Sequence, residues 1–166
     1  ALLAAAVSTK LAAPSALPKT SSKFKVFTRP ALFPGVIAGA IGFAVGAFIS
    51  FSPLIGQQLG LSNPGLYLTI YAVANLMGQF IFGPISDRWG RRWVIAPGML
   101  LLAAALTMLG MPLSARLALV TPFLFGLGTS SAVPGILAWA VDLSAPHEHG
   151  LANSTVLILW ELFVTA

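Results

Sequence analysis

Residues 83–93 read Gly-Pro-Ile-Ser-Asp-Arg-Trp-Gly-Arg-Arg-Trp and set four charged side chains between two long apolar runs. The flanking runs, 66–86 and 93–115, contain no Asp, Glu, Lys or Arg. Gly83 and Gly90 let the backbone turn tightly, because glycine carries no Cβ. The stretch therefore predicts a short charged turn that joins two apolar helices.

The composition of the chain is that of a membrane protein. Of its 166 residues, 57% are hydrophobic and 8% are charged, whereas soluble domains contain about 25% charged residues. The net charge of +5 could suggest nucleic acid. The basic residues, however, stand at the ends of apolar segments, where a membrane protein places them, so no nucleic-acid partner is expected.

Apolar segments of spanning length follow one another along the chain. A spanning helix needs about 20 predominantly apolar residues. We expect an all-α, polytopic helix bundle over 31–166, in which the fifth segment is truncated. The predicted spans are 31–55, 66–86, 93–115, 117–141 and 150–166.

The basic residues predict the orientation of these spans. Loops rich in Lys and Arg stay cytoplasmic. Eight of the nine basic residues fall before the first span or between the second and third, and Arg116 is the exception. The segment before the first span and the turn at 87–92 are therefore expected on the cytoplasmic side of the cell (inner) membrane, and the uncharged loop 56–65 on the other.

Residues 1–30 have two interpretations. They start with nine apolar or small residues and continue with a basic segment that is rich in Ser and Pro and has no acid. One interpretation is a targeting peptide. The other, which we favour, is the end of a preceding helix followed by a basic cytoplasmic linker, because the chain begins with Ala1 and not with Met.

Three of the four acidic residues stand at predicted cytoplasmic helix ends. Asp87 ends the second span and Asp142 ends the fourth, at the same predicted depth. Either carboxylate could pair with Arg91 or Arg92 through charge-assisted hydrogen bonds. We interpret this network as a conformational latch; the simpler alternative is a basic loop that serves only orientation. The proposed latch residues are Gly83, Asp87, Arg88, Gly90, Arg91, Arg92 and Asp142.

The fourth acid, Glu161, lies inside a predicted span. Eleven residues after Gly150, it would be about 16 Å into the bilayer. A carboxylate at that depth must be paired, hydrated or protonated. It is a candidate for proton coupling or substrate contact, and the alternative is a structural hydrogen bond.

A polar stripe in the second span is a second candidate for contact with a substrate. Tyr71, Asn75 and Gln79 follow one another at four-residue steps, which places them on one helix face. Such residues line a cavity or bond to another helix, and both interpretations stay open.

The charged turn resembles the loop signature of the major facilitator superfamily, Gly-x-x-x-Asp-Arg-x-Gly-Arg-Arg, with every position filled. Residues 63–67, 125–128 and 150–155 are similar to further landmarks of its efflux-type permease branch, in the C-terminal half. The resemblance implies that this chain is a fragment of a twelve-helix protein, containing the end of helix six, the central linker, helices seven to ten and part of helix eleven.

The resemblance also implies a function. Members of this superfamily are secondary transporters that use alternating access around a central site. The implied partners are a small-molecule substrate, the lipid bilayer, a proton or ion gradient and the remaining half of the transporter. Proton-coupled efflux is the expectation. The alternatives are a non-transporting scaffold subunit and an N-terminal half that follows a targeting peptide.

The sequence offers no sign of an enzyme, a cofactor or a metal site. No nucleophile is paired with a base, and no Gly-rich phosphate loop is present. The chain has no cysteine. His147, Glu148 and His149 are adjacent, but their loop supplies no third protein ligand of good geometry for zinc.

Overall fold

The computed structural model describes residues 27–111 and 114–165, and within these ranges every regular element is a helix. This confirms the predicted all-α fold class. Most of the predicted linker, residues 1–26, lies outside the described residues. The helices are α2 (Arg29–Gln58), α3 (Gly65–Trp89), α4 (Arg92–Leu109), α5 (Ala115–Ala118), α6 (Val120–Asp142), the 3₁₀ turn η1 (Pro146–Glu148) and α7 (His149–Val164).

Four of these helices, α2, α3, α4 and α6, are long and apolar enough to cross a membrane. The chain is thus a multi-pass membrane protein. The fifth, α7, has 16 residues and measures about 24 Å at 1.5 Å per residue, so the described part of it falls short of a hydrocarbon core about 30 Å thick.

The third helix is shorter than the uncharged run that predicted it. The run extends to 115, whereas α4 ends at Leu109. Gly110 and Pro112 come next in the sequence, and a residue that precedes proline disfavours the helical conformation. Absence of charge thus marks apolar sequence, while glycine and proline determine where the helix ends.

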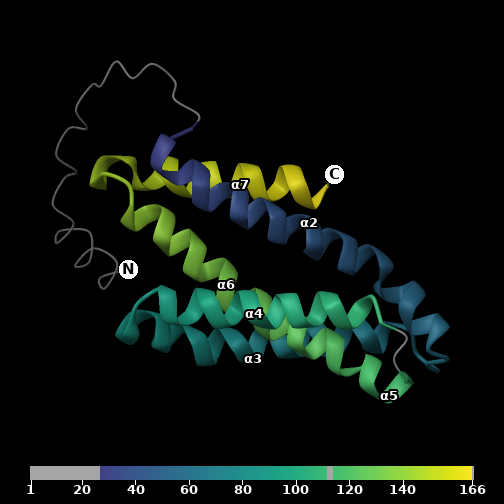
Figure 1. Ribbon diagram of the computed structural model, residues 1–166. Coiled ribbons are helices and arrows are strands. Elements are labelled where there is room, and N and C mark those ends of the chain that lie inside the picture. Colours follow the sequence, from purple (N-terminus) through teal and green to yellow (C-terminus); the bar gives the residue numbers. More distant parts are fainter. Residues whose placement is uncertain (1–26, 112–113, 166) are drawn as a thin grey trace, which may run out of the picture.

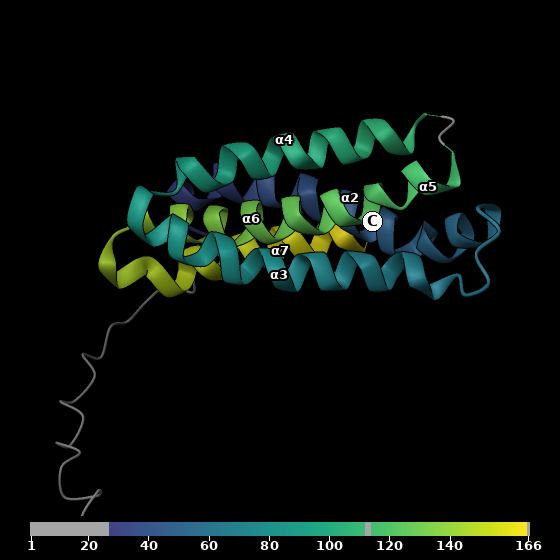
Figure 2. The same ribbon diagram turned by 90° about the horizontal axis from the view of Figure 1, so that it is seen from below.

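The helices form two sets (Figure 1). Helices α2 and α7 lie side by side and are called here the α2–α7 pair. Helix α6 packs along both α3 and α4, and these three are the α3–α4–α6 group. Seen from below, α6 lies between α3 and α4 in projection, with α2 and α7 behind (Figure 2). Because α6 also contacts α2, it connects the two sets.

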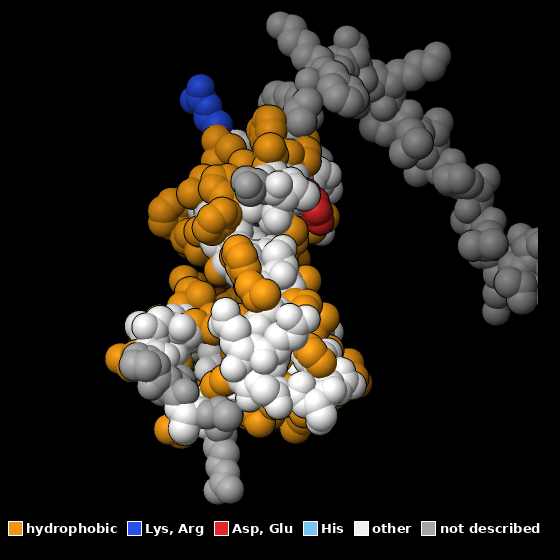
Figure 3. All heavy atoms as spheres, turned by 90° about the vertical axis from the view of Figure 1, so that its right-hand side faces the viewer, with side chains coloured by type: hydrophobic (Ala, Val, Ile, Leu, Met, Phe, Trp, Pro, Cys, Tyr) orange, Lys and Arg blue, Asp and Glu red, His pale blue; other side chains and the backbone are white. Residues whose placement is uncertain are grey.

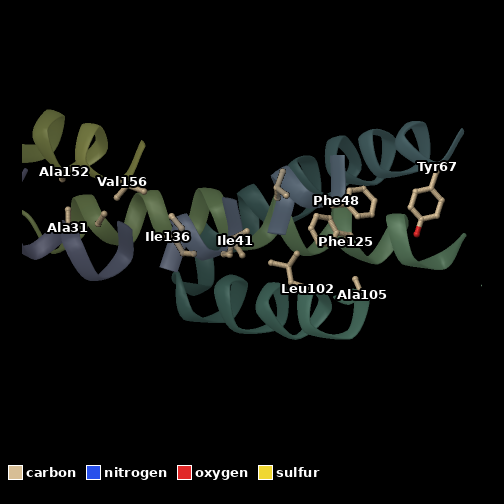
Figure 4. Packing of buried hydrophobic residues seen from close by; sticks show 14 residues of the cluster. Ala31, Ile41, Phe48, Tyr67, Leu102, Ala105, Phe125, Ile136, Ala152 and Val156 are labelled. Atoms are coloured by element: carbon tan, nitrogen blue, oxygen red, sulfur yellow. The ribbon is translucent and has the colours of Figure 1, made fainter. Parts of the chain in front are cut away.

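An aromatic cluster joins the two sets (Figure 4). The ring of Phe48 from α2 stacks on that of Phe125 from α6, with centroids 4.4 Å apart. On its other side Phe48 lies 5.7 Å from the ring of Tyr67 at the start of α3. All three side chains are buried. Stacked pairs of this kind are worth about 0.5–1.5 kcal/mol beyond their area of burial.

Within the α2–α7 pair, glycines on one face of α2 meet α7. A Cβ on Gly39 would lie 2.9 Å from the ring of Phe163, and one on Gly42 would lie 3.0 Å from the carbonyl oxygen of Trp160. Gly35 and Gly46 face α7 in the same way. Small residues let membrane helices approach closely, since packing and not hydrophobicity holds helices together in lipid. The glycine stripe of α2 is therefore a packing seam.

The charged residues of the described chain lie at one end of the bundle, apart from Arg116 on α5 and Glu161 on α7. The α3–α4 turn, the α6–α7 connection and the start of α2 all lie at the left in Figure 1. Seen from the opposite end, the surface is mostly hydrophobic side chains, backbone and uncharged groups (Figure 3). We call the charged end the latch end. This segregation is what the positive-inside pattern predicts for a single membrane orientation.

Candidate functional site

The turn between α3 and α4 brings the signature residues together. Helix α3 ends at Trp89, and Gly90 follows with φ +93°. That is a backbone region that side chains other than glycine rarely occupy. The turn has only two residues, Gly90 and Arg91, before α4 starts at Arg92. It therefore directs Arg91 back toward the last turn of α3.

Arg91 bridges two carboxylates on different helices. Its Nη1 donates to Oδ1 of Asp87 at 3.3 Å, and its Nε donates to Oδ2 of Asp142 at 3.3 Å. Nη1 also donates to Oγ of Ser86 at 3.0 Å. The planar guanidinium presents its N–H groups in a fixed fork, so a single side chain ties the end of α3 to the end of α6.

The latch ion pairs are open to solvent on their acidic side. The side chain of Asp87 is 77% exposed and that of Asp142 is 55% exposed, against 33% for Arg91. Exposed ion pairs contribute roughly 0–1 kcal/mol each. The network is therefore weak enough to break and re-form, which a conformational switch requires.

The other predicted latch residues are not part of this network. Arg88 and Arg92 are exposed, and neither makes an ion pair with another described residue. A Cβ on Gly83 would meet nothing within 4 Å, so this glycine is not required by a close contact inside the described chain. Of the two arginines that could have bridged the carboxylates, the structure brings only Arg91 to them.

The predicted polar stripe bonds to α6. Asn75 donates from Nδ2 to Oγ1 of Thr129 at 2.9 Å, and Gln79 donates from Nε2 to Oδ1 of Asn75 at 2.8 Å. Tyr71 packs its ring 5.3 Å from that of Phe48. Asn75 and Tyr71 are half-buried, while Gln79 is exposed. The stripe thus serves interhelical bonding at Asn75 and leaves the Gln79 side chain accessible.

A cavity of about 270 Å³ extends from the latch along the α3–α6 contact. Its lining extends along α3 from Gln79 to the turn at Arg91. The lining residues come from α3, α4, α6 and the turn: Gln79, Phe82, Gly83, Ser86, Asp87, Arg91, Val94, Ser130, Ser131, Pro134 and Gly135.

Glu161 lies apart from the latch, on an exposed part of α7. It shares a shallow groove with Leu157, Ile158, Leu162 and Thr165. These residues face away from the α2 glycines, which contact Val156, Leu159, Trp160, Phe163 and Val164. The Glu161 side chain makes no hydrogen bond or ion pair with another described residue. The described helices therefore bring Glu161 to neither the latch nor the polar stripe.

Sequence reasoning missed three contributors to these contacts. Ser86 sits inside the signature as one of its unspecified positions, yet it accepts from Arg91. Thr129 accepts a hydrogen bond from Asn75, and Ser131 donates one to the carbonyl of Val94 at 2.6 Å. The clustering of Thr129, Ser130 and Ser131 in an apolar span was the available signal. It indicated close packing but not the partner of each hydroxyl.

No metal is predicted for the described residues, and Glu148 is the acid nearest two histidines in the sequence. No group of three or more His, Asp or Glu side chains among the described residues is close enough to hold an ion. Glu148 instead accepts a hydrogen bond at Oε2 from Oγ1 of Thr28, at 3.1 Å.

Comparison with known proteins gives the family. A family model described as Major Facilitator Superfamily matches residues 32–165. The chain belongs to the major facilitator superfamily. This confirms the family that the signature predicted, and the helical bundle is that of a superfamily member.

Relatives of the chain are named as transporters of this superfamily. An uncharacterized MFS-type transporter of Enterobacter sp. (strain 638) is 26% identical over 126 residues, covering 73% of this chain and 31% of the relative. The uncharacterized MFS-type transporter YcaD is 26% identical over 121 residues, in Escherichia coli and in Salmonella arizonae, covering 70% of this chain and 30% of the relative. No solved structure shows a significant match.

The chain thus spans about a third of the length of these curated relatives. Membership and the relatives' names support a multi-pass membrane protein of a transporter family.

Proposed function

We propose that this chain is the helix-seven-to-eleven portion of a secondary active transporter, of the efflux-permease type, that exports small molecules by alternating access in exchange for protons that move down their gradient. The observation that carries the proposal is the bridge from Asp87 through Arg91 to Asp142. It ties two helices at one end of a membrane bundle through exposed, breakable ion pairs. The remaining half of the transporter and the lipid bilayer complete the assembly.

In the proposed cycle the latch holds one conformation. While Arg91 bonds to both carboxylates, the ends of α3 and α6 stay together at the latch end. We place this end and the basic N-terminal linker on the cytoplasmic side of the inner membrane, because of the excess of Lys and Arg there. Breaking the bridge then permits opening toward the cytoplasm.

Glu161 is the proposed coupling residue. It is the acid that lies within a membrane helix away from the charged end, and its neighbours in the groove are mainly apolar. A carboxylate in that setting must find a proton, water or a partner as the protein changes conformation. Asn75, Gln79 and Tyr71 are the proposed substrate contacts on α3.

The test is transport by the full-length protein in proteoliposomes, with wild type beside Glu161→Gln. We expect transport of lipophilic cations or small metabolites that follows an imposed pH gradient in wild type and falls to background in the variant. Substrate exchange without a gradient should survive, because exchange needs no net proton movement. Thr165→Val, in the same groove, is the matched control and should behave as wild type.

Gradient-driven transport that survives in Glu161→Gln would refute the coupling role. Loss of both gradient-driven transport and exchange would assign Glu161 to substrate binding instead. If the wild type transports none of these cations or metabolites but assembles stably into a larger complex, the result supports the scaffold alternative and refutes the transport proposal.

A further inference from the structure

Helix α3 packs against α6 along its first half and leaves it along its second half. A Cβ on Gly78 would collide with Oγ of Ser130, and Ala74, one turn earlier, is fully buried. From Gln79 onward, residues of α3 line a cavity whose other wall includes Ser130, Ser131, Pro134 and Gly135 of α6. The two helices are therefore separated by this cavity on the side of the latch.

The cavity of about 270 Å³ occupies this separation. Among its lining residues, Asp87 and Arg91 lie nearest the latch end, whereas Gln79 on α3 and Ser130 on α6 lie farthest from it along their helices. A water molecule needs roughly 10–15 Å³ of such volume together with two to four polar partners. The groove thus has room for several water molecules.

The lining offers oxygen atoms that can accept hydrogen bonds, because its serine hydroxyls already donate their hydrogens to backbone carbonyls. Ser130 donates its hydroxyl to the carbonyl of Leu127 at 2.8 Å, and Ser131 donates to the carbonyl of Val94 at 2.6 Å. Pro134 has no N–H, so the carbonyl of Ser130, one turn earlier, lacks its usual helical donor. Gln79 adds a side-chain carbonyl. Acceptors at membrane depth require donors, because lipid tails provide none.

Neither a lipid tail nor a bound cation suits this lining. A tail would leave the serine and glutamine oxygens without donors. A cation would meet the guanidinium of Arg91, which already bonds to Ser86 and Asp87 at the mouth. Water supplies two donors, carries no charge and fits the volume.

We propose that the groove between α3, α4 and α6 is a hydrated inlet that admits water from the latch end as far as Gln79 and Ser130. The tight contact of Gly78 with α6 closes its inner end. A hydrated groove lets the latch half of α3 part from α6 without breaking dry apolar contacts. Only the side of the membrane on which the inlet opens rests on the proposed function, since the cytoplasmic assignment of the latch end belongs to that proposal.

The experiment measures thiol accessibility in the full-length protein. Single-cysteine variants Gln79→Cys and Gly83→Cys, in a background freed of any other cysteine, are exposed to a small, membrane-impermeant methanethiosulfonate in inside-out vesicles. Phe80→Cys is the matched control, because Phe80 lies one residue from Gln79 and its side chain is 75% exposed on the apolar face of α3. Ala74→Cys tests the closed inner end. Thiolates form in water and not in lipid.

We expect Gln79→Cys and Gly83→Cys to react about ten-fold or more faster than Phe80→Cys and Ala74→Cys, because only the first two thiols would ionise in water. Ser130→Cys, a nearly isosteric change, is the second probe from the α6 side in case Gln79→Cys does not fold. The inlet is refuted if the thiol of Gln79→Cys, or that of Ser130→Cys, reacts no faster than the thiol of Phe80→Cys.

Two further outcomes are decisive. Reaction of Gln79→Cys from the other face of the membrane alone would refute an inlet that opens at the latch end on the cytoplasmic side. If Gln79→Cys reacts from the cytoplasmic face at the expected rate in a protein that shows no transport, the inlet is supported while the transport proposal fails. Labelling needs no turnover, so the two failures are distinguishable.

Discussion

The α2–α7 pair and the α3–α4–α6 group both place glycines where two helices come closest, and they differ in their polar contacts. In the pair, the hydrogen bond from Thr28 N to Oγ1 of Thr155, at 3.1 Å, lies at one end. In the group, side-chain bonds occur at several levels, from Asn75 with Thr129 to Arg91 with Asp142.

This difference concerns how the register between helices is determined. Packing between glycines and apolar side chains is not directional, so several neighbouring registers have similar contact energy. Hydrogen bonds require specific distances and angles, so they favour one register. The group carries the latch, whose atoms must meet within about 3 Å, and it is the set with bonds along its length.

The largest expected effect is at a glycine of the group. In Gly126→Ala, the new Cβ would lie 2.5 Å from the carbonyl oxygen of Tyr71 and 2.9 Å from the amide nitrogen of Asn75. Backbone atoms cannot move aside as a flexible side chain can. We expect the free energy of unfolding to fall by about 2–3 kcal/mol, as in overpacked cores, measured by thermal denaturation in detergent.

The control for this prediction is Gly83→Ala, since a Cβ there meets nothing within 4 Å. It should change the free energy of unfolding by no more than about 0.5 kcal/mol, as surface substitutions usually do. Equal losses in the two variants would mean that the close approach of α3 to α6 is not what stabilises the group.

The next effect tests the polar bond of the pair. Thr155→Val removes the acceptor of the Thr28 N–H, and both residues are buried. A buried donor without a partner costs about 1–3 kcal/mol. We expect a loss of about 1–2 kcal/mol in the free energy of unfolding.

Thr155→Ser keeps the hydroxyl and should recover most of that loss. If valine and serine at this position destabilise equally, the effect lies in the shape of the side chain, and the α2–α7 pair would then depend on packing at this end too.

The smallest effect on stability, and the most direct effect on conformation, is expected at the latch. Asp87→Asn removes one charge from an ion pair whose acid is 77% exposed. Such pairs are worth up to about 1 kcal/mol, so the fraction of molecules with the latch end open should rise by up to about five-fold. Distances between spin labels on α3 and α6 of the full-length protein measure that fraction.

Arg88→Gln is the control for the latch, because it removes a charge from the same turn without touching an ion pair between described residues. A shift of equal size in Arg88→Gln would indicate that the charge of the turn matters and the bridge does not. No shift in either variant would leave the turn with a role in membrane orientation alone.

The candidate site residues were predicted from local signals. The signature at 83–93 and the four-residue steps of Tyr71, Asn75 and Gln79 each depend on neighbours within two or three helical turns. Helical periodicity converts such spacings directly into faces. The site roles of these residues remain proposals.

The sequence by itself determined the fold class, the family and the apolar segments, because charge depletion, hydrophobic length and a contiguous motif are properties of local sequence. The tertiary structure alone decided which partners meet: Arg91 and not Arg92 for Asp142, Thr129 for Asn75, and Thr155 for Thr28. These partners lie 51, 54 and 127 positions apart. Such pairings depend on how the helices cross and rotate, which the packing of the whole bundle determines and no local pattern contains.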